Sequence, residues 1–215
     1  ATRQPLLIAC AHLGSWELFA EVMARRGHVF SAVVRPLTGA FNEWIVENRR
    51  RAGVELILQR GALRKMLTAL KAGRAVVQLI DQALPDAQAL WVPFFGRLAS
   101  TTPAVSMAAL HTGAPTYVVV AVRDGDALRM HVDGPVPLPA EGTREARLAA
   151  HTAALTAIIE GHVRAQPEQW LWLHPRWKAV PPSDGQAQHQ AGLDEGRVLQ
   201  RLEAPPHVGA GARLK

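Results

Sequence analysis

The stretch Leu6-Leu7-Ile8-Ala9-Cys10-Ala11-His12-Leu13-Gly14-Ser15-Trp16-Glu17 decides the fold of this chain. Its first half, Leu6 to Ala11, is a continuous apolar run that is typical of a strand buried on both faces. From Trp16 to Arg26 the apolar residues recur at the spacing of an amphipathic helix. The sequence therefore predicts a strand, a turn at Gly14-Ser15 and a helix, with His12 just past the carboxyl end of the strand.

His12 and Glu17 lie five positions apart across this turn. On a continuous helix, side chains with this spacing point roughly 140° away from each other, so they can meet only if the turn bends the chain. Ser15 is a natural N-cap, and it places Glu17 in the first helical turn, where the helix dipole favours an ionised carboxylate. We predict that Glu17 holds the imidazole of His12 in one tautomer and stabilises its protonated form. A capped helix beside an ordinary histidine is the alternative interpretation.

Strands and helices alternate along the rest of the chain. The apolar runs predict strands at Leu6–Ala11, Val29–Val34, Val54–Leu58, Ala75–Ile80 and Thr116–Val122, a weaker one at Leu128–Val132, and a short final strand at Trp170–Leu173. The helical patterns are Trp16–Arg26, Phe41–Arg51, Ala62–Ala72 and Arg144–Gln166. Such alternation predicts an α/β fold, a layered αβα domain with a largely parallel central sheet.

Polar residues follow three of the predicted strands, at the point where each strand ends. They are His12, Arg35 and Asp81. Because ligands of parallel sheets usually bind beyond the carboxyl ends of the strands, we expect these three side chains to rim one crevice.

Composition fits one soluble domain followed by a tail. The chain has 215 residues, of which 48% are apolar and 20% charged, which is ordinary for a folded protein. We predict a domain over residues 1–178 and a disordered tail over residues 179–215, where Pro, Gly, Gln, His and Ala dominate without periodicity. No stretch reaches about 18 predominantly apolar residues, so the sequence predicts no membrane-spanning helix.

The charge balance favours anionic partners. Lysine and arginine number 24 against 18 acidic residues, a formal net charge of +6. Such a surface suits phospholipid head groups, phosphorylated substrates, an acidic carrier protein or nucleic acid. The single cysteine, Cys10, excludes an internal disulfide and is more typical of a reducing compartment.

Five short motifs occur in a fixed order over residues 6 to about 178. They are His12 to Glu17, Val34-Arg35-Pro36-Leu37, Leu79-Ile80-Asp81-Gln82, Val92-Pro93-Phe94-Phe95-Gly96 with Thr101-Thr102-Pro103-Ala104, and Trp170-Leu171-Trp172-Leu173-His174-Pro175-Arg176-Trp177-Lys178. Together they resemble the lipid A biosynthesis late acyltransferase family. This family is a branch of the glycerolipid acyltransferase superfamily, whose signature is a histidine, four residues and an acid.

The resemblance implies an enzyme that moves a fatty acyl chain from acyl carrier protein, or from coenzyme A, to a hydroxyl of a glycolipid. It implies a lipid A precursor as acceptor, the cytoplasmic face of the cell inner membrane as location, and neither a cofactor nor a metal. Another glycolipid or a lysophospholipid is the alternative acceptor. Family members usually begin with a membrane-anchoring helix, so we expect an upstream anchor to be missing from this chain, which opens on Ala1.

The resemblance also assigns roles. His12 would act as general base, with Glu17 orienting its ring. Arg35 would bind the acceptor phosphate or the charge that develops on the thioester oxygen, unless it forms an ordinary ion pair. Asp81 would orient a sugar hydroxyl, pair with Arg35, or merely cap a loop.

An apolar segment is the predicted acyl pocket. Phe94, Phe95 and Gly96, within the uncharged run Trp91–Gly96, would line it, and simple core packing is the alternative. The terminal Trp170–Lys178 segment suits either a membrane interface or packing on the sheet.

Three other functions stay open. A hydrolase would pair His12 with Cys10 or with a serine, but the chain has no Gly-x-Ser-x-Gly pattern. A basic nucleic-acid binder is disfavoured, because the chain lacks zinc-ligand spacing and RNA-binding aromatic motifs, and we predict no nucleic-acid partner. A catalytically silent lipid binder is the third.

Overall fold

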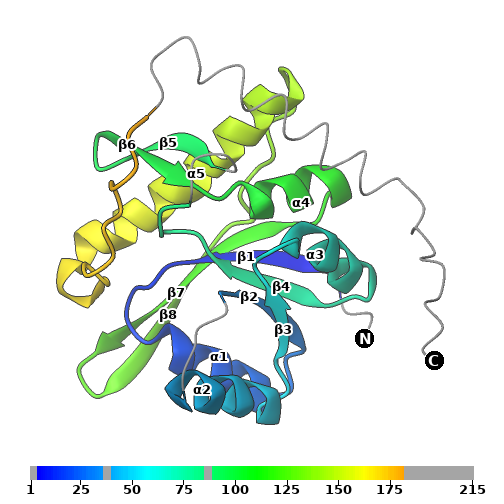
Figure 1. Cartoon of the computed structure of the whole chain (residues 1–215), viewed down its shortest axis with the longest axis vertical. Helices are drawn as coiled ribbons and strands as arrows, with labels where there is room; N and C mark the ends of the chain where they lie inside the picture. The colour runs from blue at the N-terminus through cyan, green and yellow to red at the C-terminus, as the bar shows by residue number, and fades with distance from the viewer. Residues whose placement is uncertain (1–3, 36–39, 85–88, 182–215) are drawn as a thin grey trace, which may run out of the picture. The chain divides into compact units, whose positions relative to one another are not determined.

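The computed structural model describes residues 4–35, 40–84 and 89–181, and of residues 40–42 it describes the backbone alone (Figure 1). The contacts within the chain separate residues 1–181 from residues 182–215. The predicted disordered tail falls almost wholly on residues 182–215, which lie outside the described part.

A six-stranded sheet forms the centre of the domain (Figure 1). Its order is β3-β2-β4-β1-β7-β8, and its first five strands run parallel while β8 runs antiparallel to β7. The strands are β1 (Leu6–Cys10), β2 (Phe30–Val34), β3 (Glu55–Leu58), β4 (Ala75–Leu79), β7 (Thr116–Asp124) and β8 (Ala127–Asp133). The predicted αβα domain with a largely parallel sheet is confirmed.

Helices cover both faces of the sheet. Figure 1 shows α1 (Trp16–Arg25) and α2 (Ala40–Arg51) on one side. On the other side lie α3 (Ala62–Lys71), α4 (Ala104–Thr112) and α5 (Arg144–Ala165). In the described part of the chain, none of the helices is long and apolar enough to cross a membrane.

The two faces of the sheet are buried to different degrees. Leu7, Ala9 and Val76 point toward α3–α5 and are fully buried. Their neighbours Leu6 and Ile8, which point toward α1, stay partly accessible. The helix α1 itself has no buried residue. The prediction that the first strand is buried on both faces is therefore wrong for the α1 side, because α1 does not close down on the apolar surface beneath it.

Two parts of the structure differ from the prediction: a hairpin, and the closing segment Trp170–Lys178. The hairpin pairs β5 (Leu90–Phe94) with β6 (Arg97–Thr101) and lies beside α5. The predicted final strand at Trp170–Leu173 is wrong, since only Trp170 forms a bridge, with Leu13. The residues after it form turns, with bonds such as that from the Trp172 N–H to the Trp170 carbonyl.

The closing segment is anchored by one buried arginine. Arg176 is 1% exposed and donates to the Ser100 carbonyl (2.5 Å) and to Thr101 Oγ1 (2.6 Å). Burial lowers the pKa of Arg176 to about 10, and the Asp81 charge partly offsets this effect. Because an arginine with this pKa is still charged at neutral pH, its two bonds fix the segment against β6.

Candidate active site

The loop between β1 and α1 holds His12 in a fixed place. Gly14 has φ of 63°, and a Cβ atom there would lie 2.2 Å from the Ala121 carbonyl oxygen. The Ser15 N–H donates to that same oxygen (2.7 Å), and the Gly14 N–H donates to the Gln169 carbonyl (2.9 Å). The turn can approach β7 this closely only because residue 14 has no side chain. Ser15 occupies the N-cap position as predicted, although its side chain forms no capping bond.

His12 is paired with Asp81. The ring Nδ1 lies 2.8 Å from Asp81 Oδ1, and the backbone N–H of His12 donates to Oδ2 at 2.8 Å. The indole Nε1 of Trp170 also donates to Oδ2, at 2.8 Å. Asp81 is 3% exposed, whereas the His12 side chain is 20% exposed. The carboxylate is thus buried and held by three donors, while the ring it orients reaches solvent.

These contacts keep the carboxylate ionised. Burial by itself raises the pKa of Asp81, but the hydrogen bonds and charge of His12 and the Trp170 bond outweigh it, so the pKa lies below its ordinary value. An ionised carboxylate can only accept, so Nδ1 of His12 must carry the hydrogen. When the ring is neutral, it presents the lone pair of Nε2, which has the Gln82 side-chain nitrogen 3.3 Å away. This arrangement suits a general base.

Glu17 is engaged elsewhere, so the predicted role of Glu17 is corrected. Its carboxylate forms an ion pair with Arg49 of α2, with Arg49 Nε 3.1 Å from Oε2 and a second contact through the other guanidinium nitrogen. Glu17 does lie in the first turn of α1, as expected. From there it faces α2, and Asp81 is the residue that takes Nδ1 of His12.

Of the two other residues expected beside His12, Asp81 lies there and Arg35 is not hydrogen-bonded to it. Asp81 does lie against His12, because β4 lies next to β1, but both of its oxygens are occupied by His12 and Trp170. Arg35 follows β2 and is exposed, and it forms no hydrogen bond or ion pair with His12 or Asp81 in the described structure. The predicted Arg35–Asp81 pair is therefore wrong, and the phosphate-binding role of Arg35 stays a prediction.

The predicted acyl-pocket residues lie in a separate aromatic cluster. Phe94 is fully buried between Trp170 and Trp177, with ring centroids 5.6 and 5.8 Å away. Phe95 and Gly96 form the β5–β6 turn with φ of 52° and 71°. Phe94 packs in the core against Trp170, which is the alternative interpretation of this segment. A substrate contact of Phe95 or Gly96 stays a prediction.

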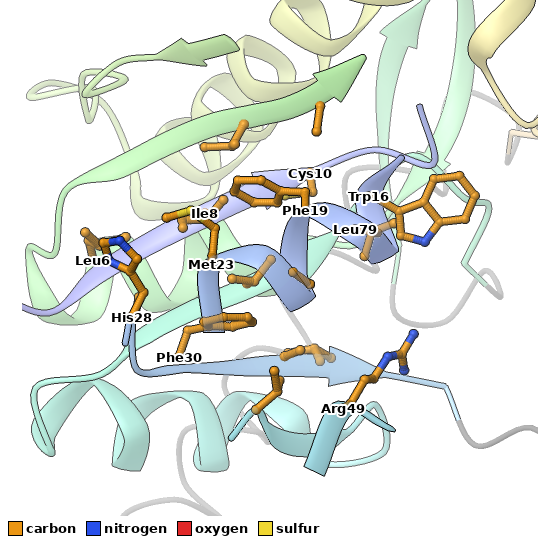
Figure 2. Close-up of a pocket in the computed structure, with 18 of the residues that line it drawn as sticks. Leu6, Ile8, Cys10, Trp16, Phe19, Met23, His28, Phe30, Arg49 and Leu79 are labelled. Carbon is orange, nitrogen blue, oxygen red and sulfur yellow. The ribbon is translucent and has the colours of Figure 1, made fainter. Parts of the chain in front are cut away.

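An apolar cavity of about 350 Å³ lies between α1 and the sheet (Figure 2). This cavity was not predicted from the sequence, because apolar residues have the same spacing in a helix–sheet interface that leaves a cavity and in one that is tightly packed. Trp16, at one end of the cavity, has its ring centroid 5.1 Å from that of His12. The cavity therefore begins beside the catalytic candidate.

Cys10 lines this cavity but is not an activated nucleophile. It is 5% exposed, and burial, with a smaller contribution from the Asp81 charge, raises its pKa to about 12. The thiol is then protonated at neutral pH, which disfavours the cysteine hydrolase. Among the described residues, no group of three His, Cys, Asp or Glu side chains is placed to hold a metal ion.

One family is indicated by the five motifs and by the site, in which a histidine and a buried aspartate lie at the carboxyl ends of adjacent parallel strands. The family described as bacterial lipid A biosynthesis acyltransferase matches residues 1–179. The chain belongs to this family. Its relatives include the lipid A biosynthesis palmitoleoyltransferase of Escherichia coli K12, 28% identical over 177 residues, which is 82% of this chain and 56% of that protein.

Two more relatives carry similar names. The lipid A biosynthesis acyltransferase of Shigella flexneri is 28% identical, again over 82% of this chain and 56% of its own length. The lipid A biosynthesis lauroyltransferase of Escherichia coli K12 is 30% identical over 84% of this chain and 58% of its own length. The chain thus spans little more than half the length of these relatives.

Proposed function

We propose that this protein transfers a fatty acyl chain from a thioester to a hydroxyl of a lipid A precursor, with His12 as general base. The observation that carries the proposal is the His12–Asp81 pair in a member of a lipid A acyltransferase family. It makes Nδ1 the donor and leaves Nε2, 3.3 Å from the Gln82 side-chain nitrogen, as the basic nitrogen of the ring. The relatives are named for palmitoleoyl and lauroyl transfer, which supports a fatty acyl substrate.

The reaction is one displacement at the thioester carbonyl. The acceptor oxygen attacks the carbonyl carbon while Nε2 of His12 takes the hydroxyl proton. Asp81 stabilises the imidazolium that forms, through the 2.8 Å contact at Nδ1. The carbon–sulfur bond then breaks, an ester remains on the acceptor, and the proton passes from His12 to the leaving thiolate. No covalent enzyme intermediate is needed.

The substrates and the location follow from the same proposal. The donor is acyl carrier protein or coenzyme A carrying the chain as thioester, and the acceptor is a phosphorylated glycolipid. Arg35, exposed at the same edge of the sheet, is proposed to bind an acceptor phosphate. Because the acceptor is a lipid, the protein is proposed to work at the cytoplasmic face of the inner membrane. The exposed Trp172 and Leu173 support contact with a membrane surface.

The test is acyl transfer by purified wild type and His12→Gln, measured with acyl carrier protein and coenzyme A thioesters and a lipid A precursor. Glutamine keeps polarity and similar volume but is no base. We expect kcat to fall by roughly 10²–10⁴. His111, which lies on α4, supplies the matched control His111→Gln. Transfer by His12→Gln at the wild-type rate would refute the proposal.

A further inference from the structure

The apolar face of the sheet beneath α1 is only partly covered by that helix. Alternate residues of four strands point to this side: Leu6, Ile8 and Cys10 of β1, Phe30, Ala32 and Val34 of β2, Ala75, Val77 and Leu79 of β4, and Val119 and Ala121 of β7. Opposite them, α1 turns Trp16, Phe19, Ala20 and Met23 toward the sheet. These four lie at helical spacing, yet none is buried.

A gap of this size is unusual inside a protein domain. Interiors are normally packed to the density of organic crystals, and a void lined by apolar atoms forfeits both burial and dispersion contacts. A helix that leaves about 350 Å³ between its own apolar stripe and an apolar sheet is suited to an apolar ligand that completes the packing.

One end of the cavity lies beside His12. Figure 2 shows Trp16 and Arg49 at one end, and Leu6 and His28 at the other, with Phe19 and Met23 between them. Trp16 contacts the His12 ring, and Arg49 is held there by its ion pair with Glu17. The Trp16 end therefore adjoins the catalytic candidate, and the cavity extends away from it along β1.

The length of the cavity suits a medium-length hydrocarbon chain. Three of the five residues of β1, Leu6, Ile8 and Cys10, turn their side chains toward the cavity, and from Leu6 to Cys10 the strand spans roughly 13 Å at about 3.3 Å per residue. An extended alkyl chain advances about 1.3 Å per carbon, so roughly ten methylene groups fit beside the strand.

We propose that this cavity binds the hydrocarbon chain of the acyl donor, with the thioester at the Trp16 end, and that Ala20 and Met23 of α1 set the length accepted. The inference rests on the proposed function, which supplies the acyl group. Ala20 lines the cavity with a small side chain, and the larger, flexible Met23 side chain lines it between the Trp16 end and the Leu6 end (Figure 2).

The first test is direct binding of decanoate, dodecanoate, tetradecanoate and hexadecanoate, measured by calorimetry without any acceptor. Ala20→Phe fills the cavity and should weaken dodecanoate binding by more than tenfold, since each methylene excluded changes affinity roughly fourfold. Ala24→Phe is the matched control, because Ala24 lies on the same helix but does not line the cavity. Met23→Ala should shift the preferred ligand toward longer chains.

The outcomes separate this inference from the proposed function. His12→Gln should bind dodecanoate as the wild type does while losing acyl transfer. If Ala20→Phe and Ala24→Phe bind every chain equally well, or if the folded wild type binds none of them, the chain lies elsewhere and this inference is overturned. Acyl transfer by the wild type but not by His12→Gln would still support His12 as the base.

Discussion

Trp170 and Asp81 are joined by a 2.8 Å hydrogen bond from the indole nitrogen to Oδ2, although 89 positions separate them in the chain. The bond explains why the closing segment of the domain matters to its active site. Trp170 is 5% exposed and also forms the bridge with Leu13 beside His12. The last part of the domain therefore holds the carboxylate that orients His12.

Replacing Trp170 with phenylalanine removes this donor and leaves most of the ring. We expect a loss of about 1.5–3 kcal/mol in unfolding free energy, because a buried bond to an ionised group is lost. A several-fold fall in kcat should accompany it. Trp172→Phe is the control, since the Trp172 indole donates to the Pro167 carbonyl at an exposed site. Equal effects of the two substitutions in urea unfolding and in kcat would argue against the role of Trp170.

Gly14→Ala should destabilise the domain more than Gly125→Ala, although both glycines adopt a left-handed conformation. A Cβ atom at residue 14 overlaps the Ala121 carbonyl, whereas at Gly125, with a similar φ of 59°, it meets nothing within 4 Å. We expect a cost of about 1–2 kcal/mol for Gly125→Ala from backbone conformation alone. Gly14→Ala should cost at least about 2 kcal/mol more. Denaturant midpoints measure both, and equal midpoints would contradict the close approach of the turn to β7.

The stability of the fold should depend on acid through Asp81. Its pKa in the folded protein lies below the ordinary value of 3.8. The carboxylate therefore stabilises the fold above about pH 4, and this contribution is lost as the pH falls through the lower folded-state value. Asp81→Asn removes this dependence. The difference in unfolding free energy between wild type and Asp81→Asn should shrink below about pH 4, and a difference independent of pH from 7 to 3 would show that folding does not lower the pKa of Asp81.

Cys10 should resist thiol reagents in the native state. Its pKa of about 12 and its burial leave almost no accessible thiolate at pH 8. Iodoacetamide should modify it only after unfolding in urea, as mass spectrometry would detect. Rapid, stoichiometric modification of the folded protein would revive Cys10 as a nucleophile.

The sequence predicted the elements around the site because each has a local signal. The apolar run of β1, the Gly14-Ser15 turn and the periodicity of α1 could all be recognised, and so could the position of Asp81 just beyond the end of β4. The pairing of His12 was not, because it depends on β4 lying next to β1, and strand order is a tertiary property. Glu17 was the nearer acid in sequence, but Asp81 is the nearer one in space.

Other elements lacked a readable signal. The helix α4 is buried at five of its nine residues, so it has no polar face to reveal a helical period. The β5–β6 hairpin contains Pro93, which is atypical of a strand, and the first residue of its two-residue turn is Phe95, in a left-handed conformation that Asn or Asp usually adopts at this position. The strand predicted at Trp170–Leu173 is wrong because alternating tryptophans are typical of a strand. Here Trp170 instead donates a hydrogen bond to the Asp81 carboxylate and packs in an aromatic cluster with Phe94.

The central claim is that Asp81, and not Glu17, orients the imidazole of His12, the proposed base. The measurement that tests it most directly is kcat for acyl transfer by Asp81→Asn and by Glu17→Gln. Both substitutions replace a carboxylate with an amide of the same shape. We predict that Asp81→Asn lowers kcat at least a hundredfold, since Nδ1 of His12 loses its ionised acceptor, while Glu17→Gln, which weakens a partly exposed ion pair, changes kcat less than about fivefold. A loss of activity in Glu17→Gln with Asp81→Asn still active would contradict the account.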